Sequence, residues 1–314
     1  MATPERVIGI DSSVAGASEV RDYWLLLKPN VMSLVVFSAA AGLYLAPGSL
    51  HPVLACVAIL CIAVAAGAAG AINNGYDADI DRVMARTRLR PTATGRISPD
   101  DALAFGVTLA LISIMVMGLA VNWVAAALLV LTIAFYVFVY TIWLKRRTPQ
   151  NIVIGGAAGA FPPMVGWAAV TGEVSLASIV LFLIIFVWTP PHFWALALYR
   201  CQDYARVGVP MLPVVAGPER TRQHILAYAL VLLPVSLLPC GVGLAGPLYG
   251  LAALALGLGF LGHATRLWQD RTRRTASRTF RYSIVYLFAL FFALVADKAL
   301  GFAPAAASGA GGAW

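Results

Sequence analysis

Long apolar runs alternate with short polar segments along this chain. Most of the apolar runs approach the ~20 residues that a transmembrane helix needs. The sequence therefore predicts nine transmembrane helices, of which the first is short unless residues 25–27 extend it. They lie at about 31–46, 53–75, 102–121, 123–143, 152–171, 174–198, 224–244, 247–265 and 282–300. The breaks at 121–123 and 244–247 leave room only for tight hairpins.

Composition supports the same fold class. Hydrophobic residues make up 61% of the chain and charged residues 11%, against about 25% charged in an ordinary globular domain. With a mean hydropathy of +0.83, 314 residues cannot hide this much apolar surface in a water-soluble core. We expect an all-α, multi-pass membrane protein that lies in a lipid bilayer.

Basic residues occur almost entirely in alternate segments between the predicted helices. The positive-inside rule then places the N-terminus and the long loops in the cytoplasm and the C-terminus outside. The net charge of +8 follows from this partition, so it implies no nucleic-acid partner, although the loops favour anionic lipids. Of the 22 basic residues, all but Lys298 lie in these segments: Arg6, Arg21, Lys28; Arg82, Arg86, Arg88, Arg90, Arg96; Lys145, Arg146, Arg147; Arg200, Arg206, Arg220, Arg222; and Arg266, Arg271, Arg273, Arg274, Arg278, Arg281.

The N-terminal segment has neither an apolar core nor the acid-poor composition of a transit peptide, since it contains Glu5, Asp11 and Glu19. We expect a bacterial cytoplasmic (inner) membrane, with the mitochondrial inner membrane as the alternative. The predicted organisation is a cytoplasmic tail at 1–24, one transmembrane domain at 25–303 and a flexible C-terminal tail at 304–314.

Three polar residues, Asn73, Asp77 and Asp81, end the second apolar run at spacings of four. On an α-helix they line one face over about 12 Å. Oxygen ligands of this kind suit Mg²⁺, which binds through carboxylates and substrate phosphates. The arginines that follow, at positions 82, 86, 88 and 90, can hold a diphosphate. The alternative is a solvated helix end whose acids pair with these arginines.

Another acid, Asp203, follows the sixth apolar run, between Arg200 and Arg206. The topology places it on the same side of the membrane as the first acidic segment, so the two ends can form one polar pocket. The alternative is a local ion pair with Arg200 or Arg206, which contributes only a few tenths of a kcal/mol.

Two double-proline strings lie within apolar runs, AFPPMVGW (160–167) and VWTPPHFW (187–194). Proline frees carbonyls that a bilayer tolerates only where protein or a cavity covers them. His192 follows the second pair, among Trp188, Phe193 and Trp194. An ionisable side chain in a span indicates function, and imidazole can ligate haem iron. The alternative is a histidine that hydrogen-bonds a carbonyl freed by the prolines.

The segment 73–91, with its acids and its arginine-rich end, resembles the first aspartate-rich motif of the UbiA-type intramembrane prenyltransferases. Within that superfamily, the strings 140–172, 188–215 and 280–290 are similar to the protohaem IX farnesyltransferases, or haem O synthases. The resemblance covers almost the whole chain after residue 25.

This resemblance implies nine helices around a central cavity, and transfer of the farnesyl group of farnesyl diphosphate to the 2-vinyl group of haem b. Asn73, Asp77, Asp81 and Asp203 would be catalytic and would hold Mg²⁺ or Mn²⁺. The substrates would be bound by six further residues: Arg86, Lys145, Arg146, His192, Trp188 and Arg206. The product, haem O, would pass to haem A synthase or a terminal oxidase.

The second motif departs from the superfamily pattern. Members often carry two aspartates four residues apart, whereas Asp203 is followed at that spacing by Val207, and Gln202 replaces an acid of some relatives. Two alternative functions stay open. A transporter would fit the broken helices, because transporter sites lie at such breaks near the midplane, but the acids cluster at helix ends. A prenyltransferase that acts on an aromatic quinone precursor would share the whole bundle.

Overall fold

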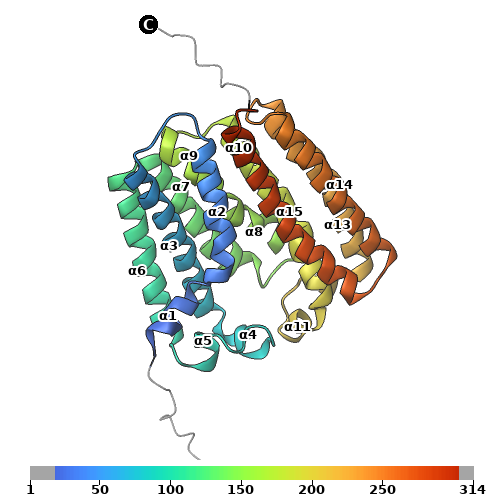
Figure 1. The fold of residues 1–314 in the computed structure, drawn as a ribbon. Helices are drawn as coiled ribbons and strands as arrows, with labels where there is room; N and C mark the ends of the chain where they lie inside the picture. Colours follow the sequence, from blue (N-terminus) through green and yellow to red (C-terminus); the bar gives the residue numbers. More distant parts are fainter. Residues whose placement is uncertain (1–17, 304–314) are drawn as a thin grey trace, which may run out of the picture.

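The computed structural model describes residues 18–303, which form a bundle of long helices with no strand among them (Figure 1). The α-helices up to the middle of the chain are α1 (Val20–Leu26), α2 (Pro29–Leu45), α3 (Pro52–Tyr76), α4 (Ala78–Val83), α5 (Pro91–Thr94), α6 (Pro99–Ala120) and α7 (Trp123–Ala134). A π-helix, η1 (Phe135–Leu144), continues α7. The remaining helices are α8 (Asn151–Ala160), α9 (Pro162–Thr171), α10 (Leu176–Tyr199), α11 (Cys201–Arg206), α12 (Leu212–Val215), α13 (Gly217–Gly241), α14 (Pro247–Gln269) and α15 (Arg273–Ala299).

Eight helical segments of the described chain are long and apolar enough to cross a membrane: α3, α6, α7 with η1, α8 with α9, α10, α13, α14 and α15. The predicted first span corresponds to α2, which has 17 residues and is about 26 Å long. It is therefore shorter than the ~30 Å hydrocarbon core. The all-α membrane fold is confirmed, and the nine predicted spans correspond to eight full-length helical segments and the short α2.

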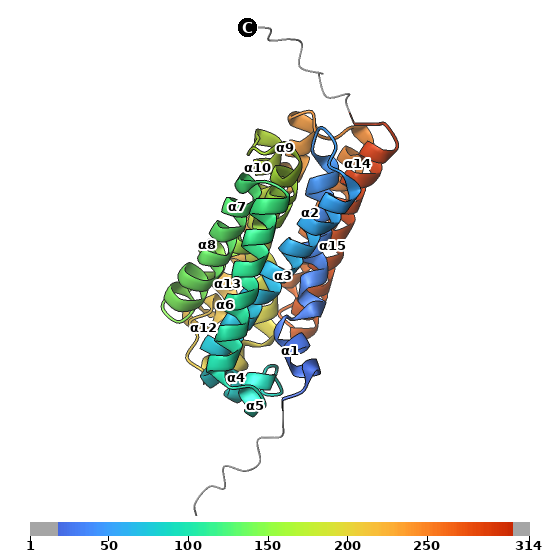
Figure 2. The same cartoon turned by 90° about the vertical axis from the view of Figure 1, so that its left-hand side faces the viewer.

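The two ends of the described chain lie at opposite ends of the bundle. Helices α1, α4, α5 and α11 lie at one end, while α15 finishes at the other (Figures 1 and 2). Residues 20–24, predicted to belong to the N-terminal tail, instead begin α1. The rest of that tail up to residue 17, and the predicted C-terminal tail at 304–314, lie outside the described residues.

Both predicted hairpins are present, and each is fixed by one polar side chain. Asn122 caps α7 by accepting from the Ala125 N–H at 2.8 Å, and its amide donates to the Ala168 carbonyl at 2.9 Å. Asp297 is fully buried in α15 and accepts from the N–H groups of Gly246 and Tyr249 at 2.6 and 2.9 Å. A carboxylate at a helix N-terminus satisfies donors that the helix itself leaves unpaired.

Glycine permits the close approach of α3 and α6 near the acidic segment. A β-carbon added at Gly75 would lie 2.8 Å from the Pro99 carbonyl oxygen, and one added at Gly106 would lie 2.8 Å from that of Ala68. No side chain fits at these two points. Gly75 is two residues before Asp77, so this contact determines where the acidic segment leaves α3.

The two double prolines have different effects. Pro162 and Pro163 separate α8 from α9 at Phe161. Pro190 and Pro191 lie inside α10, which continues through them. Next to them, the Thr189 hydroxyl donates to the Ile185 carbonyl at 2.7 Å. The second proline pair therefore leaves the helix intact.

Candidate active site

Asn73, Asp77 and Asp81 are almost fully buried, with exposed fractions of 4, 0 and 2%. A turn at Asp77 separates α3 from α4, yet the helical hydrogen bonds continue, from Asp77 N–H to the Asn73 carbonyl and from Asp81 N–H to the Asp77 carbonyl. The three side chains therefore follow one another on successive turns. The Asn73 amide donates to an Asp77 carboxylate oxygen at 2.7 Å.

Four basic side chains from three segments surround these acids. Lys28 donates to the Asn73 amide oxygen at 2.9 Å, and Lys145 pairs with Asp77. The other two are Arg146, 3.2 Å from Asp77, and Arg90, 2.7 Å from Asp81. Four half-buried basic groups thus face two buried carboxylates.

Lys28 belongs to this shell although the sequence suggested only a topological role for it. Its backbone is left-handed, with φ of +53°, an uncommon conformation for a residue other than glycine. This bend, just before Pro29, directs the chain so that the ammonium group meets Asn73. Burial, and then the charges of Arg90 and Lys145, lower the pKa of Lys28 well below its usual value.

Asp79 faces away from the buried acids, with 63% of its side chain exposed. Arg146 donates to its two oxygens at 2.7 and 2.8 Å and also lies over the Tyr76 ring. This hydrogen bond is the main reason why the pKa of Asp79 is lowered. It is likewise the first cause that raises the pKa of Arg146, with Asp77 adding to it. Arg146 thus bridges a buried acid and an exposed one.

The π-helix η1 brings a further group that sequence reasoning missed. The Thr141 hydroxyl is buried, accepts from the Asn73 amide at 3.3 Å and donates to the Tyr136 carbonyl at 2.9 Å. π-Helical turns are rare and often occur at functional sites. Here the wider turn directs Thr141 toward α3, and it cannot be recognised from apolar periodicity.

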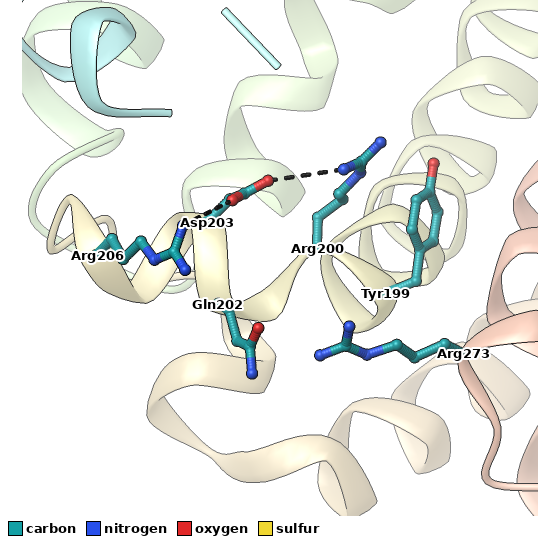
Figure 3. A pocket seen from close by; sticks show the side chains of 6 residues that line it. All are labelled: Tyr199, Arg200, Gln202, Asp203, Arg206 and Arg273. Carbon is teal, nitrogen blue, oxygen red and sulfur yellow. Dashed lines mark ion pairs between the residues drawn. The ribbon is translucent and has the colours of Figure 1, made fainter. Parts of the chain in front are cut away.

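Asp203 lies in a different pocket, of about 200 Å³, at the junction of α10, α11 and α15 (Figure 3). Arg200 and Arg206 lie 3.8 and 3.9 Å from its oxygens, so the local ion pairs considered above are both present. The pocket is lined by Tyr199, Arg200, Gln202, Asp203, Arg206 and Arg273. None of these residues belongs to the first acidic segment, so a single pocket shared by the two acidic segments stays a prediction.

The two acidic segments nevertheless lie at the same end of the bundle, since α4 and α11 are neighbours in Figure 1. A small apolar cluster joins them, in which Ile80 and Met84 from the first segment pack with Tyr204 and Val209 from the second. Within residues 18–303, no three carboxylates, imidazoles or thiols are close enough together to hold a metal ion. Any ion would need the amide oxygen and substrate oxygens as additional ligands.

His192 is buried in an aromatic stack. Its ring lies against Trp188 and Phe280, with centroids 4.3 and 4.7 Å away, and its Nδ1 is 2.6 Å from the Ser283 hydroxyl oxygen. Since that hydroxyl donates to the Phe280 carbonyl, it accepts from Nδ1–H. The proton on Nδ1 leaves Nε2 as the nitrogen with a lone pair, and no described residue bonds to it. The partner is thus a hydroxyl and not the proline-freed carbonyl that we considered.

Two predicted binding residues occupy contrasting positions. Trp188 is buried, and its indole N–H donates to the Ser283 carbonyl at 2.8 Å. Arg86 is exposed in the segment between α4 and α5, makes no ion pair with any residue from 18 to 303, and acts electrostatically on Tyr140. Trp188 therefore links the His192 ring to α15. The Arg86 guanidinium, near η1, has no ion-pair partner among the described residues.

Comparisons with known proteins agree with this architecture. Residues 35–311 match the model of the UbiA prenyltransferase family. The chain is 60% identical over 290 residues to a protoheme IX farnesyltransferase of Parvibaculum lavamentivorans, covering 91% of each chain. It is 57% identical over 305 residues to one of Acidiphilium cryptum, covering 94% of this chain and 96% of that one.

Solved structures show the same fold at lower sequence identity. A UbiA homolog from Archaeoglobus fulgidus bound to GPP and Mg²⁺ has a TM-score of 0.68 and 19% identity, over 88% of this chain and 99% of that one. A structure of digeranylgeranylglyceryl phosphate synthase has a TM-score of 0.73 and 17% identity, over 88% and 97% of the two chains.

Proposed function

The chain belongs to the UbiA prenyltransferase family, and we propose that it joins the farnesyl group of farnesyl diphosphate to the 2-vinyl group of haem b. Water adds to the resulting cation, so that haem b, farnesyl diphosphate and water give haem O, diphosphate and a proton. The names of relatives at 54–60% identity support this acceptor and donor.

The observation that carries the proposal is the buried acidic pair inside a shell of cations. Asp77 and Asp81 are buried at 0 and 2% exposure where Lys28, Lys145, Arg146 and Arg90 converge. Buried ion pairs contribute little to net stability, so two buried carboxylates beside four half-buried basic side chains indicate a role in binding a charged ligand. A metal-bound diphosphate has the required mixture of positive and negative charge.

The donor set fits Mg²⁺ or Mn²⁺. The Asp77 and Asp81 carboxylates and the Asn73 amide oxygen are hard oxygen ligands, and the site holds no thiol or imidazole. The resemblance implies Asp203 as a second metal ligand, but this carboxylate lies among three arginines, which suit an anion better than a cation. When bound, the metal ion stabilises negative charge on the leaving diphosphate.

The basic residues of the chain act on the same leaving group. As the allylic C–O bond breaks, negative charge grows on the diphosphate, and fixed cations stabilise it most where water is scarce. The contacts of Lys145 and Arg146 with Asp77 support this role for both residues. Arg86, free of ion pairs within the described chain, is a further diphosphate ligand, whereas Arg206 lies in the separate pocket around Asp203.

The apolar interior has two tasks, to hold the farnesyl chain and to keep water away from the allylic cation until the acceptor attacks. His192 is the proposed haem contact, because its Nε2 lone pair has no partner among residues 18–303 and its ring is held by Trp188, Phe280 and Ser283. We further propose that the site opens to the cytoplasm of a bacterial inner membrane, with the C-terminus outside. Haem O would then be handed to haem A synthase or a terminal oxidase.

The experiment that tests this function is a competition between acceptors. The purified membrane protein is given farnesyl diphosphate, haem b and an aromatic quinone precursor together, and all products are identified by mass spectrometry. We expect prenylated haem and unmodified quinone precursor. Prenylation of the quinone precursor alone would overturn the haem assignment while leaving the family chemistry intact.

A further inference from the structure

The pocket around Asp203 contains more positive charge than one acid requires. Three guanidinium groups, those of Arg200, Arg206 and Arg273, face a single carboxylate. The two arginine–Asp203 distances of 3.8 and 3.9 Å are longer than the 2.7–2.9 Å of a charge-assisted hydrogen bond. Arg273 makes no ion pair with any other described residue. The arginines are thus available to an external anion.

The pocket has a second source of positive potential. Arg273 is the first residue of α15, a helix of 27 residues, and Figure 3 shows its side chain extending from α15 toward α11. A helix N-terminus carries partial positive charge, which favours anions and disfavours a cationic side chain. A basic residue at this position therefore adds to a potential that attracts negative charge.

A chain of aromatic contacts links this pocket to His192. The Phe280 ring lies 4.7 Å from the His192 ring, and Tyr199, which lines the pocket, lies 5.9 Å from Phe280. Along α10, Arg200 follows His192 by eight residues, or about 12 Å. A flat ligand that touches His192 at its centre can therefore place its edge among the arginines.

We propose that Arg200, Arg206 and Arg273 bind the two propionate carboxylates of the haem acceptor and thereby set its orientation. This inference rests on the proposed function. Three arginines and one aspartate leave two positive charges in excess, which equals the charge of two propionates. A volume of about 200 Å³ is below the ~300–1,000 Å³ that bury a whole ligand, as expected for a site that takes only one edge of it.

The orientation has a chemical consequence. In protohaem IX the vinyl groups lie on the edge opposite the propionates. With its carboxylates at the polar end of α10, the haem keeps its vinyl edge inside the apolar bundle, where water cannot reach the allylic cation. On this account Asp203 spaces and orients the guanidinium groups, which explains why it is surrounded by arginines and not by further acids.

The test compares haem b with its dimethyl ester, which lacks both propionate charges. Binding is followed by the haem absorption spectrum in the detergent-purified full chain. Wild type is expected to bind the ester about tenfold or more weakly than haem b. In Arg273→Gln and Arg200→Gln, haem b is expected to bind about tenfold more weakly, while ester binding stays within about twofold of wild type. Arg274→Gln is the matched control, because Arg274 is exposed beside Arg273 and does not line the pocket.

Three outcomes are informative. Selective loss of haem b affinity in the two variants, with the control unchanged, supports the propionate site. Equal binding of haem b and the ester by wild type overturns it and leaves the farnesyl transfer untouched. Equal weakening of both ligands in Arg273→Gln also overturns it, because the arginine would then support the fold only. Absence of haem binding by wild type would instead overturn the proposed function itself.

Discussion

The substitutions Asp77→Asn and Asp79→Asn compare a buried acid of the proposed site with an exposed acid of the same segment. At Asp77, asparagine keeps the volume and removes the charge, at a side chain that is fully buried and contacts Asn73, Lys145 and Arg146. Removing one preorganised charged group from an active site costs about 2.7–4 kcal/mol of transition-state stabilisation. At about 1.4 kcal/mol per factor of ten, farnesyl transfer should fall by roughly a hundredfold to a thousandfold.

The control is Asp79→Asn, two residues away on the same segment. Asp79 also bonds Arg146, but 63% of its side chain is exposed, and exposed pairs contribute about 0–1 kcal/mol. Its activity should stay within about fivefold of wild type. The assay is diphosphate release with haem b and farnesyl diphosphate, with thermal unfolding measured in parallel to show that both variants are folded. Equal losses in the two variants would refute a single buried catalytic face.

Four further predictions follow from the same contacts. Exhaustive chelation should abolish transfer, and Mg²⁺ or Mn²⁺ should restore it; full turnover without a divalent ion would remove the metal site. His192→Ala should weaken haem binding and alter the haem spectrum with farnesyl diphosphate binding unchanged, whereas an unaltered spectrum and affinity would make the residue structural. Gly75→Ala should lower activity about tenfold or more, because a β-carbon 2.8 Å from the Pro99 carbonyl displaces Asp77; Gly159→Ala, where nothing lies within 4 Å, is the control. Asp297→Ala should destabilise the protein by about 2–4 kcal/mol, because it leaves two buried N–H groups unpaired, and an unchanged unfolding temperature would argue against the cap.

Apolar run lengths were sufficient to locate the helices, because burial in lipid requires continuous apolar segments. The first predicted span was expected to be short, and it corresponds to α2, which has 17 residues. The helix that begins at Val20 was missed, since α1 has only seven residues and its first turn contains Arg21 and Asp22. The effect of each proline pair also depends on its surroundings: Pro162 and Pro163 divide a helix, while Pro190 and Pro191 do not.

The candidate site was predictable only in part. Spacing placed Asn73, Asp77 and Asp81 on successive turns, because helical periodicity is local. It gave no sign of Lys28 or Thr141. Lys28 reaches Asn73 because its own backbone is left-handed, and Thr141 reaches it from the π-helix η1. For Lys28, the available signal was its position directly before Pro29, the first residue of α2. Ser283, 91 positions from His192, has no local signal at all.

The most direct test of the central claim is the mass spectrum of the haem after incubation with farnesyl diphosphate and Mg²⁺, with the released diphosphate measured in the same sample. The account predicts that haem b gains one farnesyl group and one water-derived hydroxyl, in equal amount with diphosphate. In H₂¹⁸O the label should appear in the product. Diphosphate release with the haem unchanged in mass would contradict it.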